Sequence, residues 1–190
     1  MFSLTLSKLR MFEPFLLDPD LKSTASQIAK KTKNHQKSTQ LFLDSLENEG
    51  ILKSKRDGKN KLFFFNKDNV QVVKNFMLSL EHLRTINFYK INPKIKQFIE
   101  KITAFINGSI VLFGSYANNS HNNSSDIDIL IIGNYDEKKV SEVANTYNLD
   151  ISIKHMEKYE ENVLTREVQK NHIFLKNTEL YISEAIEWIN

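Results

Sequence analysis

Two apolar runs separated by a polar segment constrain this chain more than any other feature of its sequence. Both runs are rich in isoleucine, leucine and valine, which predicts buried strands at residues 109–113 and 126–132. Residues two apart on a strand point to the same face of the sheet. Asp126 and Asp128 are therefore expected to present adjacent carboxylates on one face, while the isoleucines at positions 127, 129 and 131 are buried on the other.

The two aspartates indicate a site for a divalent cation, because adjacent carboxylates repel one another unless a cation lies between them. Magnesium is the expected ion, since it prefers oxygen ligands, keeps several waters and completes its octahedron with substrate phosphates. The pair suits one ion or a two-ion site.

The residues around the pair fit such a site. Gly114-Ser115 ends the first strand and offers backbone N–H groups and a hydroxyl to a phosphate. A third acid, Asp150, opens the strand pattern at 149–155 and is expected beside the aspartate pair. In two-metal transfer reactions a third acid acts as general base or bridges the attacking hydroxyl and the metal.

The order of these motifs resembles the minimal nucleotidyltransferase family of the polymerase-β-like superfamily, over residues 95–176. Members carry Gly-Ser, a spacer, Asp-x-Asp on the next strand and a later strand aspartate. The residues that match in order and spacing are Gly114, Ser115, Asp126, Asp128 and Asp150. The resemblance implies that the first two bind a nucleotide and that the three aspartates are catalytic and bind Mg²⁺.

The same resemblance implies a reaction. A nucleoside monophosphate would pass from a nucleoside triphosphate to an acceptor, with pyrophosphate leaving. Some members adenylylate a partner toxin, so the implied acceptors include a protein.

One departure from the family pattern bears on activity. Many members have Arg-Gly where this chain has Asn118-Asn119. Asparagine tolerates a left-handed backbone, so Asn119 can preserve the turn, whereas Asn118 cannot replace a guanidinium charge. Lys154, on the same strand face as Asp150, either supplies positive charge or is a solvated surface lysine. Two functions stay open: an active enzyme, or a transcription regulator whose nucleotidyltransferase fold is inactive or only senses nucleotide.

The N-terminal third carries a different pattern. A short helix at 26–32, a polar break, a longer helix at 35–49 and two strand-like runs around Asp57-Gly58 follow one another. Over residues 21–66 this order resembles the winged helix-turn-helix of prokaryotic regulators. In that family the longer helix enters the major groove of double-stranded DNA and the hairpin contacts phosphates.

The resemblance assigns contacts to residue types that suit them, since Asn and Gln pair with adenine while Lys and Arg neutralise phosphates. The expected DNA-binding residues are Asn34, His35, Gln36, Lys37, Thr39 and Gln40 on the helix and Lys55, Arg56, Lys59 and Lys61 on the hairpin. The expected core of this segment is Leu41, Phe42, Leu43, Leu46 and Ile51. The alternative is a protein-interaction module, and Phe63, Phe64 and Phe65 either stack on single strands or, by strand alternation, pack in the core.

Charge distribution agrees with two partners of different kinds. Residues 1–90 carry a net charge of +7 and residues 91–190 a net charge of −4. The basic part suits a polyanion and the acidic part suits cations. The chain has no cysteine and no apolar stretch of about 20 residues, so we expect a cytoplasmic protein without a signal peptide or a membrane span.

The sequence predicts an α+β protein with two domains. The expected parts are a winged helix-turn-helix domain at 1–68, a long linker helix at 69–91 and a mixed α/β nucleotidyltransferase-type domain at 92–190. Further helices are expected at 4–17, 93–106, 138–147, 158–170 and 178–189. The apolar stripe from Val73 to Ile86 on the linker helix either packs within the chain or forms a homodimer contact.

Overall fold

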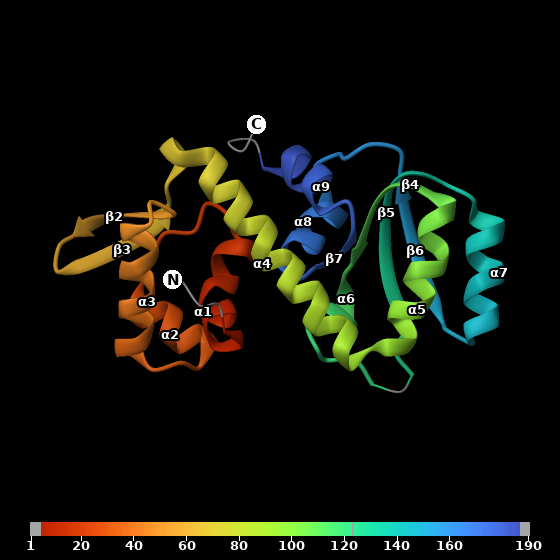
Figure 1. Ribbon diagram of the computed structural model, residues 1–190, viewed down its shortest axis with the longest axis horizontal. Helices are drawn as coiled ribbons and strands as arrows, with labels where there is room; N and C mark the ends of the chain where they lie inside the picture. Colours follow the sequence, from red (N-terminus) through yellow and green to blue (C-terminus); the bar gives the residue numbers. More distant parts are fainter. Residues whose placement is uncertain (1–4, 123, 187–190) are drawn as a thin grey trace. The chain divides into compact units, whose positions relative to one another are not determined.

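The computed structural model describes residues 5–122 and 124–186 (Figure 1). The expected helix start at Leu4, the expected helix end at Ile189 and Asn123 of the polar segment lie outside these residues. The chain forms two compact units that divide between Leu80 and Glu81, inside helix α4 (Val70–Ile91).

The first unit combines helices with a small antiparallel sheet. Its elements are α1 (Leu6–Leu17), β1 (Ser23–Thr24), α2 (Ala25–Thr32), α3 (Gln36–Asn48), β2 (Leu52–Asp57), β3 (Asn60–Phe65), a 3-10 turn (Lys67–Asn69) and the beginning of α4. The strand order is β1-β3-β2. Strands β2 and β3 form the predicted hairpin, whose turn contains Gly58 with a φ of +58°. Strand β1 is only two residues long and was not predicted.

Local signals and a common core explain these elements. Thr24 and Gln27 form a reciprocal capping box that starts α2, and Lys33 ends it in the left-handed conformation. The rings of Phe12, Phe15 and Phe65 lie 5.5 to 6.0 Å apart in the core. Phe63 and Phe65 are buried, as strand alternation predicts, so they are core residues.

Lys61 fixes the hairpin to α3. Its Nζ lies 2.8 Å from Asp44 Oδ1 and 2.6 Å from Glu47 Oε2. Burial opposes the charge on both carboxylates. The hydrogen bonds and charge of Lys61, together with a hydrogen bond from Gln40 to Asp44 and from Ser54 to Glu47, outweigh burial and lower the pKa of both groups. This arrangement holds strand β3 against the helix that precedes it.

The second unit is built on a mixed four-stranded sheet. Its elements after α4 are α5 (Pro93–Ile102), a 3-10 turn (Thr103–Phe105), β4 (Ile106–Leu112), α6 (Gly114–Ala117), β5 (Ile127–Tyr135), α7 (Glu137–Tyr147), β6 (Ile151–Met156), α8 (Val163–Lys170), β7 (Ile173–Lys176) and α9 (Thr178–Ala185). The strand order is β6-β5-β4-β7. Strand β4 is antiparallel to both neighbours, whereas β5 and β6 are parallel and joined through α7 (Figure 1).

One face of this sheet packs on α5 and α7. Ile127, Ile129 and Ile131 share a buried cluster with apolar residues of both helices, including Phe98 and Val140. The predicted burial of these isoleucines is therefore confirmed. The face of β5 that carries the half-buried Asp128 continues into the buried Leu130, so the middle of the strand is covered on both faces.

Two expected helices need correction, and one strand of the second unit was not predicted. The helix at 93–106 ends at Ile102, because a 3-10 turn follows and β4 begins at Ile106. The helix at 158–170 begins only at Val163, where Asn162 provides the cap. Strand β7 was not predicted, because a four-residue apolar run has no periodicity that separates strand from helix.

The apolar stripe of α4 is buried in the first part of the helix and becomes more exposed toward its end. Val73, Met77 and Leu80 are buried, and the ring of Phe76 lies 5.0 Å from that of Phe12 within the first unit. Ile86 is 49% exposed. Most of the stripe thus packs within the chain.

A buried ionic group joins α4 to the segment before β7 in the second unit. Arg84 Nη1 donates to both carboxylate oxygens of Glu81 at 3.0 and 2.9 Å, and His172 Nε2 lies 3.2 Å from Glu81 Oε1. All three side chains are at most 6% exposed. Burial opposes the charge on Glu81, but Arg84 and His172 outweigh it and lower its pKa.

Candidate functional site

The sheet of the second unit brings the glycine-serine bend next to the aspartate pair. The register of β4 and β5 pairs Leu112 with Ile129, and the Phe113 N–H donates to the Asp128 carbonyl at 3.0 Å. The chain therefore turns away from the sheet at Gly114, one residue after the position opposite Asp128. The predicted neighbourhood of bend and carboxylate is present.

Gly114 lies in close contact with Asp128. Its φ is +67°, in the left-handed region that glycine adopts without a steric cost. A Cβ at this position would overlap the Asp128 carboxylate. Both the backbone conformation and the close approach thus require glycine here.

The charge on Asp128 is unfavourable in the chain alone. Burial raises its pKa, and repulsion from Asp126 raises it further. A hydrogen bond from Ser152 and the positive charge of Lys154 act in the opposite direction without reversing the shift. Two adjacent carboxylates with this repulsion fit a divalent cation, which would neutralise them and take its other oxygen ligands from water and phosphate.

Asp150 lies next to the pair along the backbone. It directly precedes β6, and its carbonyl accepts a hydrogen bond from the Ile127 N–H at 2.9 Å. Its side chain is exposed. Residues 5–122 and 124–186 contain no group of three or more acidic or histidine side chains that could hold a metal ion. The structure therefore brings Asp126 and Asp128 together but does not gather Asp150 with them into a metal-binding cluster.

Two residues of β6 belong to this face and were missed or left open by sequence reasoning. The parallel register pairs Asp128 with Ser152 and Leu130 with Lys154, so both β6 side chains follow the face that carries the carboxylate. The electrostatic effect of Lys154 on Asp128 agrees with this placement. The alternation of β6 contains the signal, but only the register with β5 selects these neighbours.

In the first unit, α3 presents a mixed polar and apolar surface. His35, Gln36 and Lys37 are exposed, and Gln40 is half-buried with its amide donating to Asp44. Leu41 is 63% exposed, so its assignment to the core is wrong. Gln36, Lys37, Gln40 and Leu41 line one shallow hollow.

Three other expected DNA contacts are engaged within the protein. Thr39 is fully buried and its hydroxyl donates to the His35 carbonyl at 3.0 Å, so the expectation that it contacts DNA is wrong. Asn34 is half-buried and hydrogen-bonded to Ser7 and Thr32. Lys61 is paired with the two α3 carboxylates, whereas Lys55, Arg56 and Lys59 on the hairpin are exposed.

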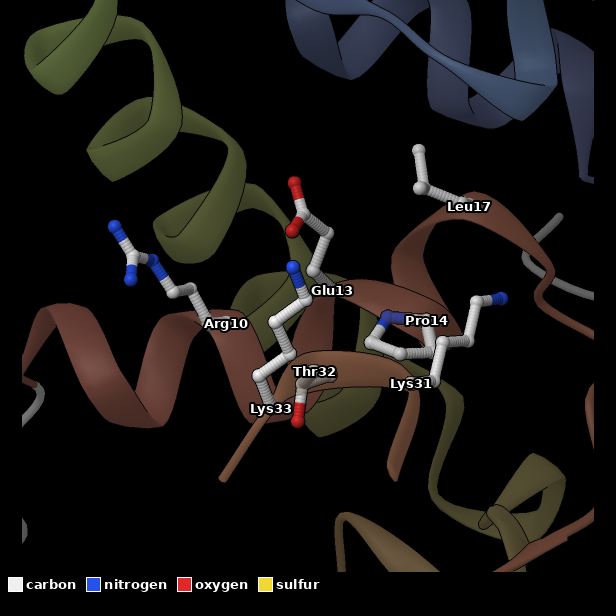
Figure 2. A pocket seen from close by; sticks show the side chains of 7 residues that line it. All are labelled: Arg10, Glu13, Pro14, Leu17, Lys31, Thr32 and Lys33. Carbon is white, nitrogen blue, oxygen red and sulfur yellow. The ribbon is translucent and has the colours of Figure 1, made fainter. Parts of the chain in front are cut away.

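A separate pocket of about 250 Å³ lies between α1 and the end of α2 (Figure 2). Arg10, Lys31 and Lys33 line it together with the carboxylate Glu13. None of its lining residues belongs to the glycine-serine bend or to the aspartate pair. The pocket is therefore a separate, mainly basic feature of the first unit.

The glycine-serine bend and the aspartate pair thus lie together at the strand ends of the second unit. Residues 92–187, half of the chain, match the nucleotidyltransferase domain family, and the chain belongs to that family. This membership supports transfer of a nucleoside monophosphate from a nucleoside triphosphate as the type of function. No curated protein and no solved structure matches the chain.

Within the described part of the chain, no helix has the length and apolar character needed to cross a membrane.

Proposed function

We propose that this protein is a Mg²⁺-dependent nucleotidyltransferase. The observation that carries the proposal is the packing of Gly114 against Asp128, whose carboxylate is repelled by that of Asp126. Gly114 and Ser115 would bind the phosphates of the nucleoside triphosphate through backbone N–H groups and the hydroxyl. Asp126 and Asp128 would hold Mg²⁺, which neutralises charge that develops on the phosphates.

The reaction follows from this arrangement. An acceptor oxygen attacks the α-phosphorus, the bond from that phosphorus to the β-bridging oxygen breaks, and pyrophosphate leaves. Asp150, exposed at the start of β6, is proposed to take the proton of the acceptor hydroxyl.

Labelling identifies both nucleotide and acceptor. The full chain is incubated with α-labelled ATP, GTP, CTP or UTP, Mg²⁺, and extract of its own cells. We expect label to enter one macromolecular acceptor, protein or nucleic acid, with release of pyrophosphate and loss of both signals in EDTA. Absence of labelling and of pyrophosphate release with all four nucleotides would count against an enzyme.

We propose further that residues 1–68 form a winged helix-turn-helix domain that binds double-stranded DNA, followed by the linker helix 69–91 and the nucleotidyltransferase domain 92–190. Support comes from the element order α1-β1-α2-α3-β2-β3, the strand order β1-β3-β2 and the exposed polar residues of α3. Gln36, Lys37 and Gln40 would face the major groove, with Leu41 against thymine methyl groups. Lys55, Arg56 and Lys59 would contact phosphates.

A gel-shift series tests this DNA proposal. Lys37→Ala and Arg56→Ala are each expected to weaken duplex binding and to lower the slope of log affinity against log salt concentration by about 1. Lys101→Ala is the matched control, because it removes the same charge from α5 of the second unit. The proposal would be overturned if duplex binding changed neither with salt concentration nor in the Lys37→Ala and Arg56→Ala variants.

A second candidate function rests on the segment after the glycine-serine bend. Asn118 Oδ1 accepts hydrogen bonds from the N–H and hydroxyl of Ser120, so its side chain is held within the segment and carries no charge. A site with weakened phosphate binding suits a regulator that senses nucleotide without transferring it. Nucleotide-dependent DNA binding without pyrophosphate release would favour this function over the enzyme.

A further inference from the structure

The polar segment between the bend and the aspartate pair folds back on the bend. Ser120 N–H donates to the Ser115 carbonyl at 2.9 Å, and Asn119 takes a left-handed φ of +58° that allows the turn. Farther along, the N–H of Asn122 donates to the Ser125 hydroxyl at 3.0 Å. These bonds place the residue between them, His121, in a segment held at both ends by the two motifs of the candidate site.

His121 stacks on Tyr116, the residue after Ser115. The ring centroids are 4.0 Å apart and the ring planes differ by 8°. Among residues 5–122 and 124–186, the Nδ1 atom of His121 is buried and finds no hydrogen-bond partner. Buried polar atoms in folded proteins are rarely left unpaired, so this nitrogen needs a partner that the described residues do not provide.

The charge of the site identifies the kind of partner. Between Gly114 and Asp128, His121 is the one side chain that can carry a positive charge. A triphosphate beside Asp126 and Asp128 would bring several further negative charges to the same strand ends. In the protonated imidazole both nitrogens donate, and the face of a tyrosine ring attracts a cation.

We propose that His121, oriented by its stack on Tyr116, donates a hydrogen bond to a phosphate oxygen of the nucleoside triphosphate. The proposal rests on the proposed nucleotide site and assigns His121 to binding of the β- and γ-phosphates, the part that leaves as pyrophosphate. The preference of the site for triphosphate over monophosphate then depends on the His121 ring.

Two substitutions distinguish the effect of the hydrogen-bond donor of His121 from the effect of its ring stacking on Tyr116. His121→Phe keeps an aromatic ring on Tyr116 but removes both nitrogens, whereas His121→Gln keeps a donor but removes the ring. His82→Phe on the exposed side of α4 is the matched control. Calorimetry with Mg²⁺ compares each of the four nucleoside triphosphates with its monophosphate, on the full chain, for wild type and all variants.

We expect His121→Phe to reduce the preference for triphosphate over monophosphate about tenfold, the scale of one charge-assisted hydrogen bond. His121→Gln should retain part of the preference, and His82→Phe should retain all of it. An unchanged preference in His121→Phe overturns the inference, and so does an equal loss of affinity for both ligands, which indicates a structural role only.

A further variant separates this inference from the proposed function. If wild type binds no nucleoside triphosphate, both are overturned. If wild type binds and Asp126→Asn/Asp128→Asn abolishes the Mg²⁺-dependent part, but His121→Phe keeps the wild-type preference, then the nucleotide site stands and only the role of His121 is overturned.

Discussion

The Asp126→Asn/Asp128→Asn variant is expected to lose nucleotidyl transfer by about 10³-fold or more, with no loss of stability. Asparagine keeps the size of each side chain and leaves an oxygen to accept the hydrogen bond from Ser152. It removes the negative charge that would hold Mg²⁺. Transfer and Mg²⁺-dependent nucleotide binding should therefore disappear together.

The stability of the same variant has a predicted sign. Burial and Asp126 raise the pKa of Asp128 above its ordinary value of 3.8. Between the ordinary pKa and the raised pKa of the folded state, the folded protein binds more protons than the unfolded protein. The free energy of unfolding therefore falls as the pH rises through this range, and the whole loss of stability is present at neutral pH. Asp128→Asn removes that cost, and thermal unfolding at pH 7 should occur at an equal or higher temperature.

The control for this experiment is Glu142→Gln, which removes an exposed charge from α7 of the same unit. It should leave both transfer and unfolding unchanged. A double asparagine variant that still transfers nucleotide with Mg²⁺ would remove the two aspartates from the mechanism. A variant that loses activity and unfolds at a lower temperature would show that the pair is structural.

The features that could be predicted from sequence depend on short-range periodicity. The strand period of two places Asp126 and Asp128 on one face whatever the rest of the sheet does. Strands β4, β5 and β6 and the hairpin of β2 and β3 were recognisable for the same reason, because apolar runs and turn residues are local signals. The glycine-serine bend follows from its position directly after such a run.

The neighbours of Asp128 on β6 depend on the register of a parallel pair. Strands β5 and β6 are separated by helix α7, so no local signal aligns them. A shift of one residue would turn Ser152 and Lys154 to the other face of the sheet and bring isoleucines in their place. For this reason the sequence left the role of Lys154 open and could not predict that Ser152 and Lys154 act on Asp128.

The errors on α3 have a different cause. Leu41, Phe42 and Leu43 are consecutive and apolar, and a helix cannot bury all three equally. The buried stripe is Thr39, Phe42, Leu43 and Leu46, which has the spacing of one helix face. Thr39 belongs to that face although it is polar, and Leu41 lies outside it although it is apolar. Spacing was thus the better guide than residue type.

Gly114→Ala is expected to destabilise the protein by about 2–3 kcal/mol and to abolish transfer, because it combines a left-handed backbone with a steric overlap. The matched control is Gly58→Ala in the hairpin turn. Gly58 has a similar φ of +58°, but a Cβ there meets no atom within 4 Å. Gly58→Ala should therefore show the backbone cost alone, about 1 kcal/mol.

A double-mutant cycle assigns the difference to the Asp128 carboxylate. Because that carboxylate is the group that an added Cβ would overlap, Asp128→Ala should make room for it. In the Asp128→Ala background, Gly114→Ala should cost no more than Gly58→Ala does in wild type, so the two substitutions at the site should be non-additive by about 1–2 kcal/mol. Urea unfolding of the four proteins measures this coupling. Additive costs would mean that Gly114 and Asp128 are not in contact, and the bend would then have no direct part in placing the carboxylate on which the proposed transfer depends.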